Sequence, residues 1–325
     1  MRLPAMRRSA SVTLLLMLGT VMAACGSSSP SKTATATNVV CTAKTGSTLA
    51  VLGDDKHLED SDNIIPIVRT SVAQQPLIDA LNQVSAALSQ VALVNLNVQV
   101  SDDRVDPTAA ATQFVSAHNL GQGLSGGSGS ITIAAQGFDE NETLADIAAD
   151  VLTKVGYTAT AKVVGERELY EPALEANQVQ AVMDYAASMT TYLATKVNST
   201  LMPSTQIATT VTVLKQLATP RGLTVLNAAA ATDEDAFAVT RATATAYGLK
   251  TLSDLATKCP GGVTLGGPAN CPQRPECQPG LLGTYKLKTT FTALDEDGPL
   301  TRSALNSGKV FLGVIFSSDP DATPA

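Results

Sequence analysis

The chain has 325 residues, of which 44% are hydrophobic and 16% are charged, and it contains no tryptophan. This length and composition are typical of a globular protein with room for two domains. Without Arg2, Arg7 and Arg8 of an apparent signal segment, the 22 basic residues fall to 19 against 29 acidic ones, a net charge of about −10. That balance disfavours binding to nucleic acid, which requires clustered Lys and Arg. The two histidines, His57 and His118, lie far apart, so neither a zinc enzyme nor a histidine-based triad is expected, and no cofactor is implied.

The first 24 residues have the features of an export signal. A basic start is followed by an apolar run, Val12 to Leu18, that is too short to span a bilayer permanently. The small residues before Cys25 resemble the bacterial lipobox, in which that cysteine receives the lipids; the alternative is an ordinary cleaved signal with an incidental cysteine. We therefore expect a protein lipid-anchored to the cell membrane on its extracytoplasmic face. Residues 25–47, rich in Ser, Thr, Ala and Lys, are expected to form a flexible stalk.

Four further cysteines, Cys41, Cys259, Cys271 and Cys277, remain in the exported part. An even number in an oxidising compartment favours disulfides over a metal site. The sequence by itself allows three pairings.

Strand and helix patterns alternate along the first part of the mature chain. Leu49 to Leu52 is expected to be a short strand, and Pro76 to Val91 a helix with one apolar face. Asp106 and Pro107 indicate the start of a helix that continues through Ala117. Residues 121–130 read GQGLSGGSGS and are expected to form a flexible linker.

The alternation continues after this linker. Ile131 to Ala135 is expected to be a strand, and Asp139 with Glu142 forms a capping-box pattern ahead of an amphipathic helix. Ordinary helices are expected between most of the remaining strands. This order is typical of an α/β fold with mainly parallel sheets. The further strands are expected at residues 158–164, 179–183, 223–226, 236–240, 263–265 and 310–316.

Several segments in sequence resemble the osmoprotectant-binding family, the substrate-binding proteins of ABC importers for glycine betaine, choline and carnitine. Residues 131–157, ITIAAQGFDENETLADIAADVLTKVGY, are similar to the opening strand, turn and helix of that family. The segments VVGERELYEPALEANQVQAVMDYAAS, AAATDEDAFAVTRATATAYGLKTLSDLA and GGPANCPQRPECQPGL follow in family order, and ALNSGKVFLGVIFSSD ends the series. The resemblance implies a two-lobed type II periplasmic-binding-protein fold that closes on a small ligand.

The segment that should follow SSD in the family stands instead at the front, as LAVLGDDKHLEDSDNIIPIVR and the two helices after it. We therefore interpret the chain as a circular permutant, with its old ends joined through the linker and new ends opened near Ser47 and Asp319. This interpretation predicts the following parts: a signal peptide at 1–24, a stalk at 25–47, lobe one at 48–230 with the permutation linker at 121–130, lobe two at 231–319, and a tail at 320–325.

The same interpretation leaves one covalent crossing between the lobes. We expect Cys41, beside the first strand of lobe one, to pair with Cys259 in lobe two and so to restore a second connection. Cys271 would then pair with Cys277. The alternative is that Cys259 pairs within its own lobe and Cys41 stays on the stalk.

The resemblance also suggests ligand-binding residues. The family holds a quaternary ammonium among aromatic rings, whose π faces attract a cation that cannot donate hydrogen bonds. Tyr185 and Phe316 match two of these positions, with buried core aromatics as the alternative. The other aromatic positions are replaced by acidic or amide residues, which could still attract a cation by Coulomb attraction. These replacements are Asp235 in lobe two and Asp62 and Asn63 in the segment DSDN.

A ligand carboxylate is gripped in the family by an arginine and a lysine. Arg274, between Cys271 and Cys277, matches the arginine, although a solvated surface arginine is the alternative. Gln136 replaces the lysine and brings no charge. Asp233 matches a polar position of the pocket.

These residues predict a non-enzymatic protein that captures a quaternary ammonium solute, such as glycine betaine or choline, and delivers it to an ABC permease in the membrane. The alternatives are a binding protein for another small polar or aromatic solute, and a sensory or scaffolding lipoprotein with the same fold. A G-x-S-x-G pattern around Ser125 lies in the linker and is not expected to be catalytic.

Overall fold

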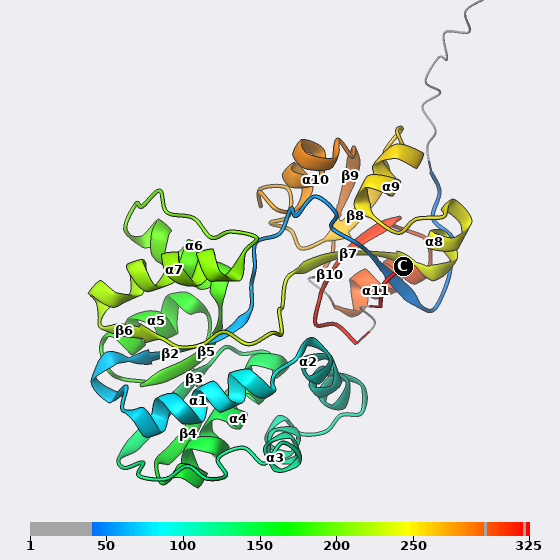
Figure 1. The fold of residues 1–325 in the computed structure, drawn as a ribbon. Coiled ribbons are helices and arrows are strands. Elements are labelled where there is room, and N and C mark those ends of the chain that lie inside the picture. Colours follow the sequence, from blue (N-terminus) through cyan, green and yellow to red (C-terminus); the bar gives the residue numbers. More distant parts are fainter. Residues whose placement is uncertain (1–40, 296–297, 321–322) are drawn as a thin grey trace, which may run out of the picture. The chain divides into compact units, whose positions relative to one another are not determined.

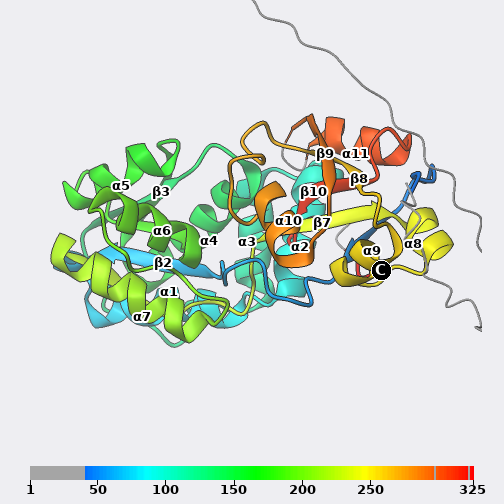
Figure 2. The ribbon, with the colours of Figure 1, turned by 90° about the horizontal axis from the view of Figure 1, so that it is seen from above.

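The computed structural model describes residues 41–295, 298–320 and 323–325. The expected signal peptide, Cys25 and most of the expected stalk lie outside these residues. The described chain contains two five-stranded sheets, each with helices on both faces (Figures 1 and 2). We call the two sheets with their helices lobe one and lobe two.

Lobe one has the strand order β4-β3-β5-β2-β6. Side chains alternate between the faces of its strands: Ile64 and Val68 of β2 pack with α1, α3 and α4, whereas Ile65 and Ile67 pack with α5, α6 and α7. Both faces are therefore apolar and covered (Figure 1). The strands are β2 (Ile64–Arg69), β3 (Ser130–Ala135), β4 (Thr158–Val163), β5 (Ala181–Tyr185) and β6 (Leu223–Val225); the helices are α1 (Gln75–Ala87), α2 (Gln90–Asn97), α3 (Pro107–Ala117), α4 (Asp139–Val155), α5 (Arg167–Glu175), α6 (Ala186–Lys196) and α7 (Ile207–Ala218).

Lobe two has the strand order β1-β7-β10-β8-β9. Helices α9 and α10 pack on one face of its sheet, and α11 packs on the other (Figure 1). The strands are β1 (Leu49–Leu52), β7 (Asp235–Thr240), β8 (Val263–Gly267), β9 (Thr289–Ala293) and β10 (Leu312–Phe316); the helices are α8 (Arg241–Tyr247), α9 (Leu252–Lys258), α10 (Gln278–Tyr285) and α11 (Pro299–Asn306).

The sheets are mixed rather than mainly parallel. In lobe one, β3 pairs in parallel with β4 and β5, but β2 pairs antiparallel with β5 and β6. In lobe two, β10 and β8 are parallel, as are β8 and β9, whereas β7 is antiparallel to β1 and to β10. The antiparallel pairs arise where the chain crosses from one lobe to the other, because those connections are not strand-helix-strand crossovers.

The expected lobe boundary is wrong at its start. Leu49 to Leu52 was assigned to lobe one, but this strand pairs with β7, with Leu49 opposite Thr240. The described chain therefore crosses between the lobes twice, at residues 53–63 and 226–234, and not once.

Both expected disulfides are present, but the first has a different role from the one expected. Cys41 is bonded to Cys259 and Cys271 to Cys277. Cys41 packs in the same lobe-two core cluster as Cys259. The Cys41–Cys259 bond consequently attaches the segment before β1 to lobe two, and it does not connect the two lobes.

Two local expectations also change. The helix expected over residues 76–91 ends at Ala87 and restarts at Gln90, because the Ser89 side chain caps the new helix by accepting from Ala92 N. The helix α2 continues into a π-helix over Val98–Asp102. Asp139 is the first residue of α4 and makes no capping box. By contrast, Asp106 caps α3 as expected.

The glycine-rich linker is packed and is not a free tether. Gly127 N donates to Val155 O at 3.1 Å, and Thr158 N donates to Gly129 O at 2.9 Å. A Cβ atom on Gly127 would lie 2.5 Å from the Tyr157 ring, so this position requires glycine for close packing.

Within the described ranges, no single helix is long and apolar enough to cross a membrane; the bent pair formed by residues 75–87 and 90–102 has that length and apolarity only when taken together.

The two disulfides should contribute unequally to stability. Their cysteines are 218 and 6 residues apart, and a longer closed loop removes more entropy from the unfolded chain. Replacing Cys41 and Cys259 together with serine should lower the free energy of unfolding by about 5 kcal/mol, and replacing Cys271 and Cys277 by about 2 kcal/mol. Urea unfolding of the two double variants measures both values, and a larger loss in the second variant would contradict this ranking.

Candidate functional site

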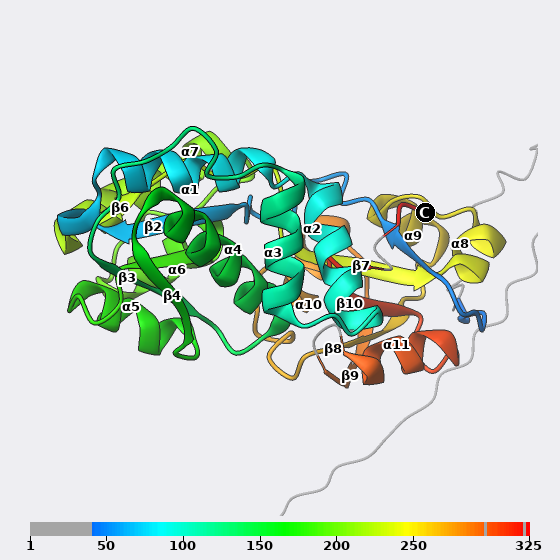
Figure 3. The ribbon, with the colours of Figure 1, turned by 90° about the horizontal axis from the view of Figure 1, so that it is seen from below.

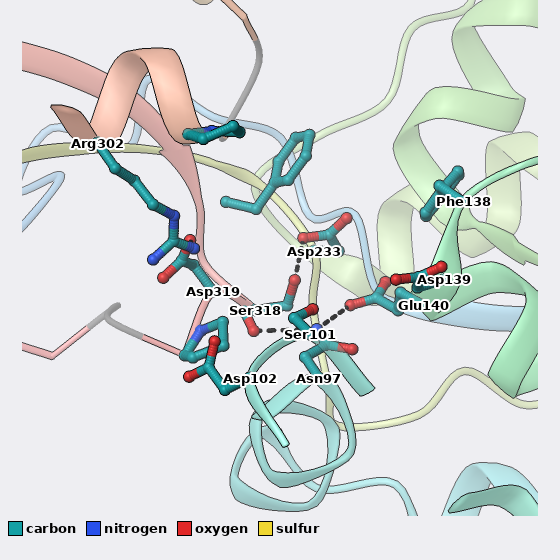
Figure 4. A pocket seen from close by; sticks show the side chains of 13 residues that line it. Asn97, Ser101, Asp102, Phe138, Asp139, Glu140, Asp233, Arg302, Ser318 and Asp319 are labelled. Carbon is teal, nitrogen blue, oxygen red and sulfur yellow. Dashed lines mark hydrogen bonds and ion pairs between the residues drawn. The ribbon is translucent and has the colours of Figure 1, made fainter. Parts of the chain in front are cut away.

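A cavity of about 560 Å³ is lined by residues of both lobes (Figure 4). Lobe one contributes the start of α4 and the end of α2 with its π-helix. Lobe two contributes α11 and the segment after β10, and one residue comes from the second crossing. The lining residues are Asn97, Ser101, Asp102, Phe138, Asp139, Glu140, Asp233, Pro299, Arg302, Phe316, Ser318, Asp319 and Pro320.

The turn between β3 and α4 is fixed by a buried amide. Gln136 N donates to Asn141 Oδ1 at 2.8 Å, and Asn141 Nδ2 donates to Met183 O on β5 at 2.8 Å. Asn141 has no exposed surface, so these bonds satisfy polar groups that water cannot reach. The turn therefore holds Phe138, which is 39% exposed, at the cavity wall, with its ring centroid 6.3 Å from that of Tyr185.

Glu140 joins three parts of the site. Tyr185 Oη donates to Glu140 Oε1 at 2.8 Å, and Asn97 Nδ2 donates to Glu140 Oε2 at 2.6 Å. The same Asn97 Nδ2 donates to Ser318 O, in lobe two, at 3.0 Å. Burial raises the pKa of Glu140, and burial together with the neighbouring Glu140 carboxyl raises the pKa of Tyr185. This network links β5, α4 and α2 to the end of β10.

Helix α2 makes a second contact to lobe two (Figure 3). Gln90 Nε2 donates to Ser317 O at 3.1 Å and to Thr232 O at 3.1 Å. Gln90 and Asn97 are the first and last residues of α2, so both ends of this helix donate hydrogen bonds to the segment that follows β10.

The lobe-two wall carries two further polar pairs. Ser318 Oγ donates to Asp233 Oδ1 at 2.6 Å. Arg302 forms an ion pair with the buried Asp319, and Figure 4 shows this pair opposite Phe138 and Asp139. The one arginine among the described lining residues therefore has a carboxylate beside it.

Two of the other expected site residues, Asp62 and Asn63, lie in the first crossing, whereas Asp235 and Arg274 lie in lobe two. Asp62 accepts from Ser188 N at 2.9 Å and from Ser188 Oγ at 2.6 Å, and Asn63 Nδ2 donates to Ala229 O at 2.9 Å. Arg274 is ion-paired with Asp235. The contacts of Asp62 and Asn63 hold the first crossing against α6 and against the second crossing.

The structure therefore brings only part of the expected set to the cavity. Phe316 and Asp233 line it, and Tyr185 reaches it through Glu140. The remaining expected residues are not among those that line it, namely Gln136, Asp62, Asn63, Asp235 and Arg274.

Several lining residues could not be expected from the sequence pattern. Phe138, Asp139 and Glu140 lie in the segment GFDENE, which was matched to the family turn but was not assigned to the site. The lining residues of α2 and α11 carried no motif. They reach the cavity only through the packing of their helices.

The cavity is acidic. Asp102 and Asp139 are exposed at it, and Asp233 and Glu140 lie deeper. In the part of the chain that the structure describes, no group of three or more His, Cys, Asp and Glu is placed to hold a metal ion. Together with the rings of Phe138 and Phe316, these carboxylates suit an organic cation.

The crossings should make stability depend on pH through Glu234. Burial raises the pKa of Glu234 to about 7, and the nearby Asp62, Asp54 and Asp60 add to this shift. Between pH 4.5 and 7 the folded protein holds this proton and the unfolded chain does not, so stability from this group falls as pH rises. Glu234→Gln keeps an oxygen for Asp62 N, which donates to Glu234 Oε1 at 3.2 Å.

The Glu234→Gln variant should therefore be more stable than the wild type at pH 8, by at most about 3 kcal/mol, with the difference vanishing near pH 4. Urea unfolding at several pH values gives both curves. Curves that run parallel from pH 4 to 8 would show that Glu234 titrates normally.

The chain is similar to a family of substrate-binding domains. The chain matches the OpuAC family, described as the substrate binding domain of ABC-type glycine betaine transport system, over residues 33–117 and 129–323. No curated protein matches it. Among solved structures, it is similar to AppA from Clostridium difficile, which is assigned as a peptide binding protein, at 11% identity and a TM-score of 0.28. That likeness covers 60% of this chain and 48% of AppA, about half the length of that structure.

Proposed function

Because this chain belongs to the family of substrate-binding domains of ABC-type glycine betaine transport systems, we propose that it captures a quaternary ammonium solute between its two lobes. Membership of this family assigns the general role of the protein. The protein is an ABC-transporter substrate-binding protein of the two-lobed type II fold, which acts outside the cytoplasm on a small molecule and has a membrane permease as its partner.

The observation that carries the proposal is the pairing of two phenylalanine side chains with carboxylates in one cavity. Phe138 belongs to lobe one and Phe316 to lobe two, and both line the cavity. A quaternary ammonium has no N–H to donate, so it is held by π faces and by opposite charge. Each ring contributes about 0.5–2 kcal/mol to such binding.

The position of the rings also suggests how binding is signalled. A ligand that contacts rings of both lobes binds more tightly to the closed arrangement, in which both rings reach it, than to an open one. A ligand shifts a conformational equilibrium only by this difference in affinity between the two states. The closed form would then be the one that the permease accepts. No step of this cycle requires catalysis by the protein, and we propose that it is not an enzyme.

We also propose that the protein is anchored through lipids on Cys25, which lies outside the described residues. Cys41, the first described residue, is fixed to lobe two by its disulfide. The segment from Cys25 to this point would then tether lobe two to the membrane. Cys25→Ser should move the protein from the membrane fraction to the soluble fraction, and retention of the variant in the membrane would contradict lipid anchoring.

Replacement of the rings by leucine tests the ligand site. Phe138→Leu and Phe316→Leu keep apolar volume but remove the π face, so each should weaken choline binding about 2- to 30-fold. Titration calorimetry measures the affinity. Phe291→Leu, on β9 and outside the cavity lining, is the matched control and should bind as the wild type does.

Two outcomes would contradict the proposal. The first is a folded wild-type protein that binds no quaternary amine. The second is choline binding that is unchanged in both ring variants, because the ligand would then lie elsewhere.

We further infer that the order of the segments is a circular permutation. Two observations support this inference: the family match is split at residues 118–128, and the carboxyl-terminal residues lie beside β1, with Val51 N donating to Thr323 O at 2.8 Å. A variant with residue 325 joined to residue 41 by a linker, which keeps the Cys41–Cys259 disulfide, and with new ends within residues 121–129 should fold and bind as the wild type does. A variant that melts without cooperativity would contradict the inference.

A further inference from the structure

We propose that the cavity selects an organic cation with a neutral polar tail and rejects ligands that also carry a carboxylate. The inference rests on the proposed function, because it concerns which quaternary amines the site accepts. Among the probes named here, it predicts tight binding of choline and weak binding of glycine betaine.

The walls of the cavity are the first reason. Asp102, Asp139 and Asp233 line it together with the buried Glu140. Asp102, Asp139 and Glu140 come from lobe one and Asp233 from the second crossing, so a ligand in the cavity has carboxylates on more than one side (Figure 4). A trimethylammonium group is attracted by the charges of the three aspartates, whereas a ligand carboxylate is repelled by them.

The second reason is that the arginines near the cavity are already ion-paired and are poorly placed to bind a ligand carboxylate. Gln136, in the turn between β3 and α4, is uncharged and does not line the cavity. Arg274 is ion-paired with Asp235 and does not line the cavity. Arg302 does line it, but its guanidinium is ion-paired with Asp319, a buried carboxylate.

Withdrawing Arg302 from Asp319 would leave a buried charge without this partner, which is costly. A ligand carboxylate would have to displace that contact in order to bind Arg302. The positive charge of Arg302 is therefore a poor receptor for an incoming carboxylate.

The third reason is the presence of neutral polar groups beside the rings. Asn97 and Ser101, at the end of α2 and in the following π-helix, line the cavity. Both N–H groups of the Asn97 amide are already used, but its Oδ1 can accept a hydrogen bond from a ligand hydroxyl, and the Ser101 hydroxyl can donate or accept one. This wall suits the alcohol of choline.

The direct test compares three ligands that differ only in their tail: choline, glycine betaine and the neutral amide of glycine betaine. Titration calorimetry should give choline an affinity at least about tenfold above that of glycine betaine. The amide should bind with an affinity close to that of choline, because it has no carboxylate. The affinity for choline should also fall with added salt.

A charge variant tests the cause. Asp139→Asn should weaken choline binding about two- to fivefold and reduce the preference for choline over glycine betaine. Asp150→Asn is the matched control: it lies on the same helix, away from the cavity lining, and its retained oxygen can still accept from Thr112 Oγ1. This control should leave both affinities unchanged.

The outcomes separate the inference from the function on which it rests. Equal affinities, or tighter binding of glycine betaine, would overturn the charge selection and leave quaternary ammonium capture intact. An unchanged preference in Asp139→Asn would overturn the role of the acidic wall. Failure of all three ligands to bind a cooperatively melting protein would overturn the proposed function as well.

Discussion

A buried carboxylate joins the parts of the chain that form the cavity in which we propose that the ligand binds. Glu140 is 8% exposed, and it accepts one hydrogen bond from Tyr185 and another from Asn97. A buried carboxyl without partners would be strongly destabilising, so these donors are a condition for the turn between β3 and α4 to sit where it does. Asn97 also donates a hydrogen bond to the Ser318 carbonyl, so the same side chain connects Glu140 to lobe two. The placement of Phe138, and with it one side of the ligand site, depends on this network.

The two crossings impose a second constraint. They concentrate acidic side chains in a small volume, and burial raises the pKa of Asp62 to about 6 and that of Glu59 to about 10. Protonation of some of these groups lets them lie close together at neutral pH without full repulsion. The Arg274–Asp235 ion pair provides opposite charge at the same place, since Arg274 lowers and Asp235 raises the pKa of Glu59. Charge at the crossings therefore supports the fold, whereas the carboxylates of the cavity face the space in which we propose that the ligand binds.

The sequence predicted the features that depend on local pattern or on matched segments. These include the α/β character, most strands, the two disulfide pairings, and the place of Phe316 and Asp233 in the cavity. It could not assign the strand Leu49–Leu52 to a sheet, because four apolar residues do not specify their partner strand. Composition also predicted a flexible linker at 121–130, where contact of Gly127 with Tyr157 produces an ordered turn.

The rest of the site could not be predicted for a related reason. Asn97, Asp102 and Arg302 are polar residues on ordinary helices, and tertiary packing alone brings them to one cavity. Arg274 illustrates the opposite case: it matches a family position, yet a local ion pair holds it away from the cavity lining. Matched residues thus identified the class of protein, whereas only some of them line the cavity proposed to bind the ligand.

A crystal structure of the protein with bound choline would test the central claim most directly. The account predicts the trimethylammonium group within about 6 Å of the ring centroids of both Phe138 and Phe316, with the carboxylates of the cavity around it. A ligand held instead at the crossings, against Asp62 or Arg274, with the cavity between Phe138 and Phe316 left unused, would contradict the account.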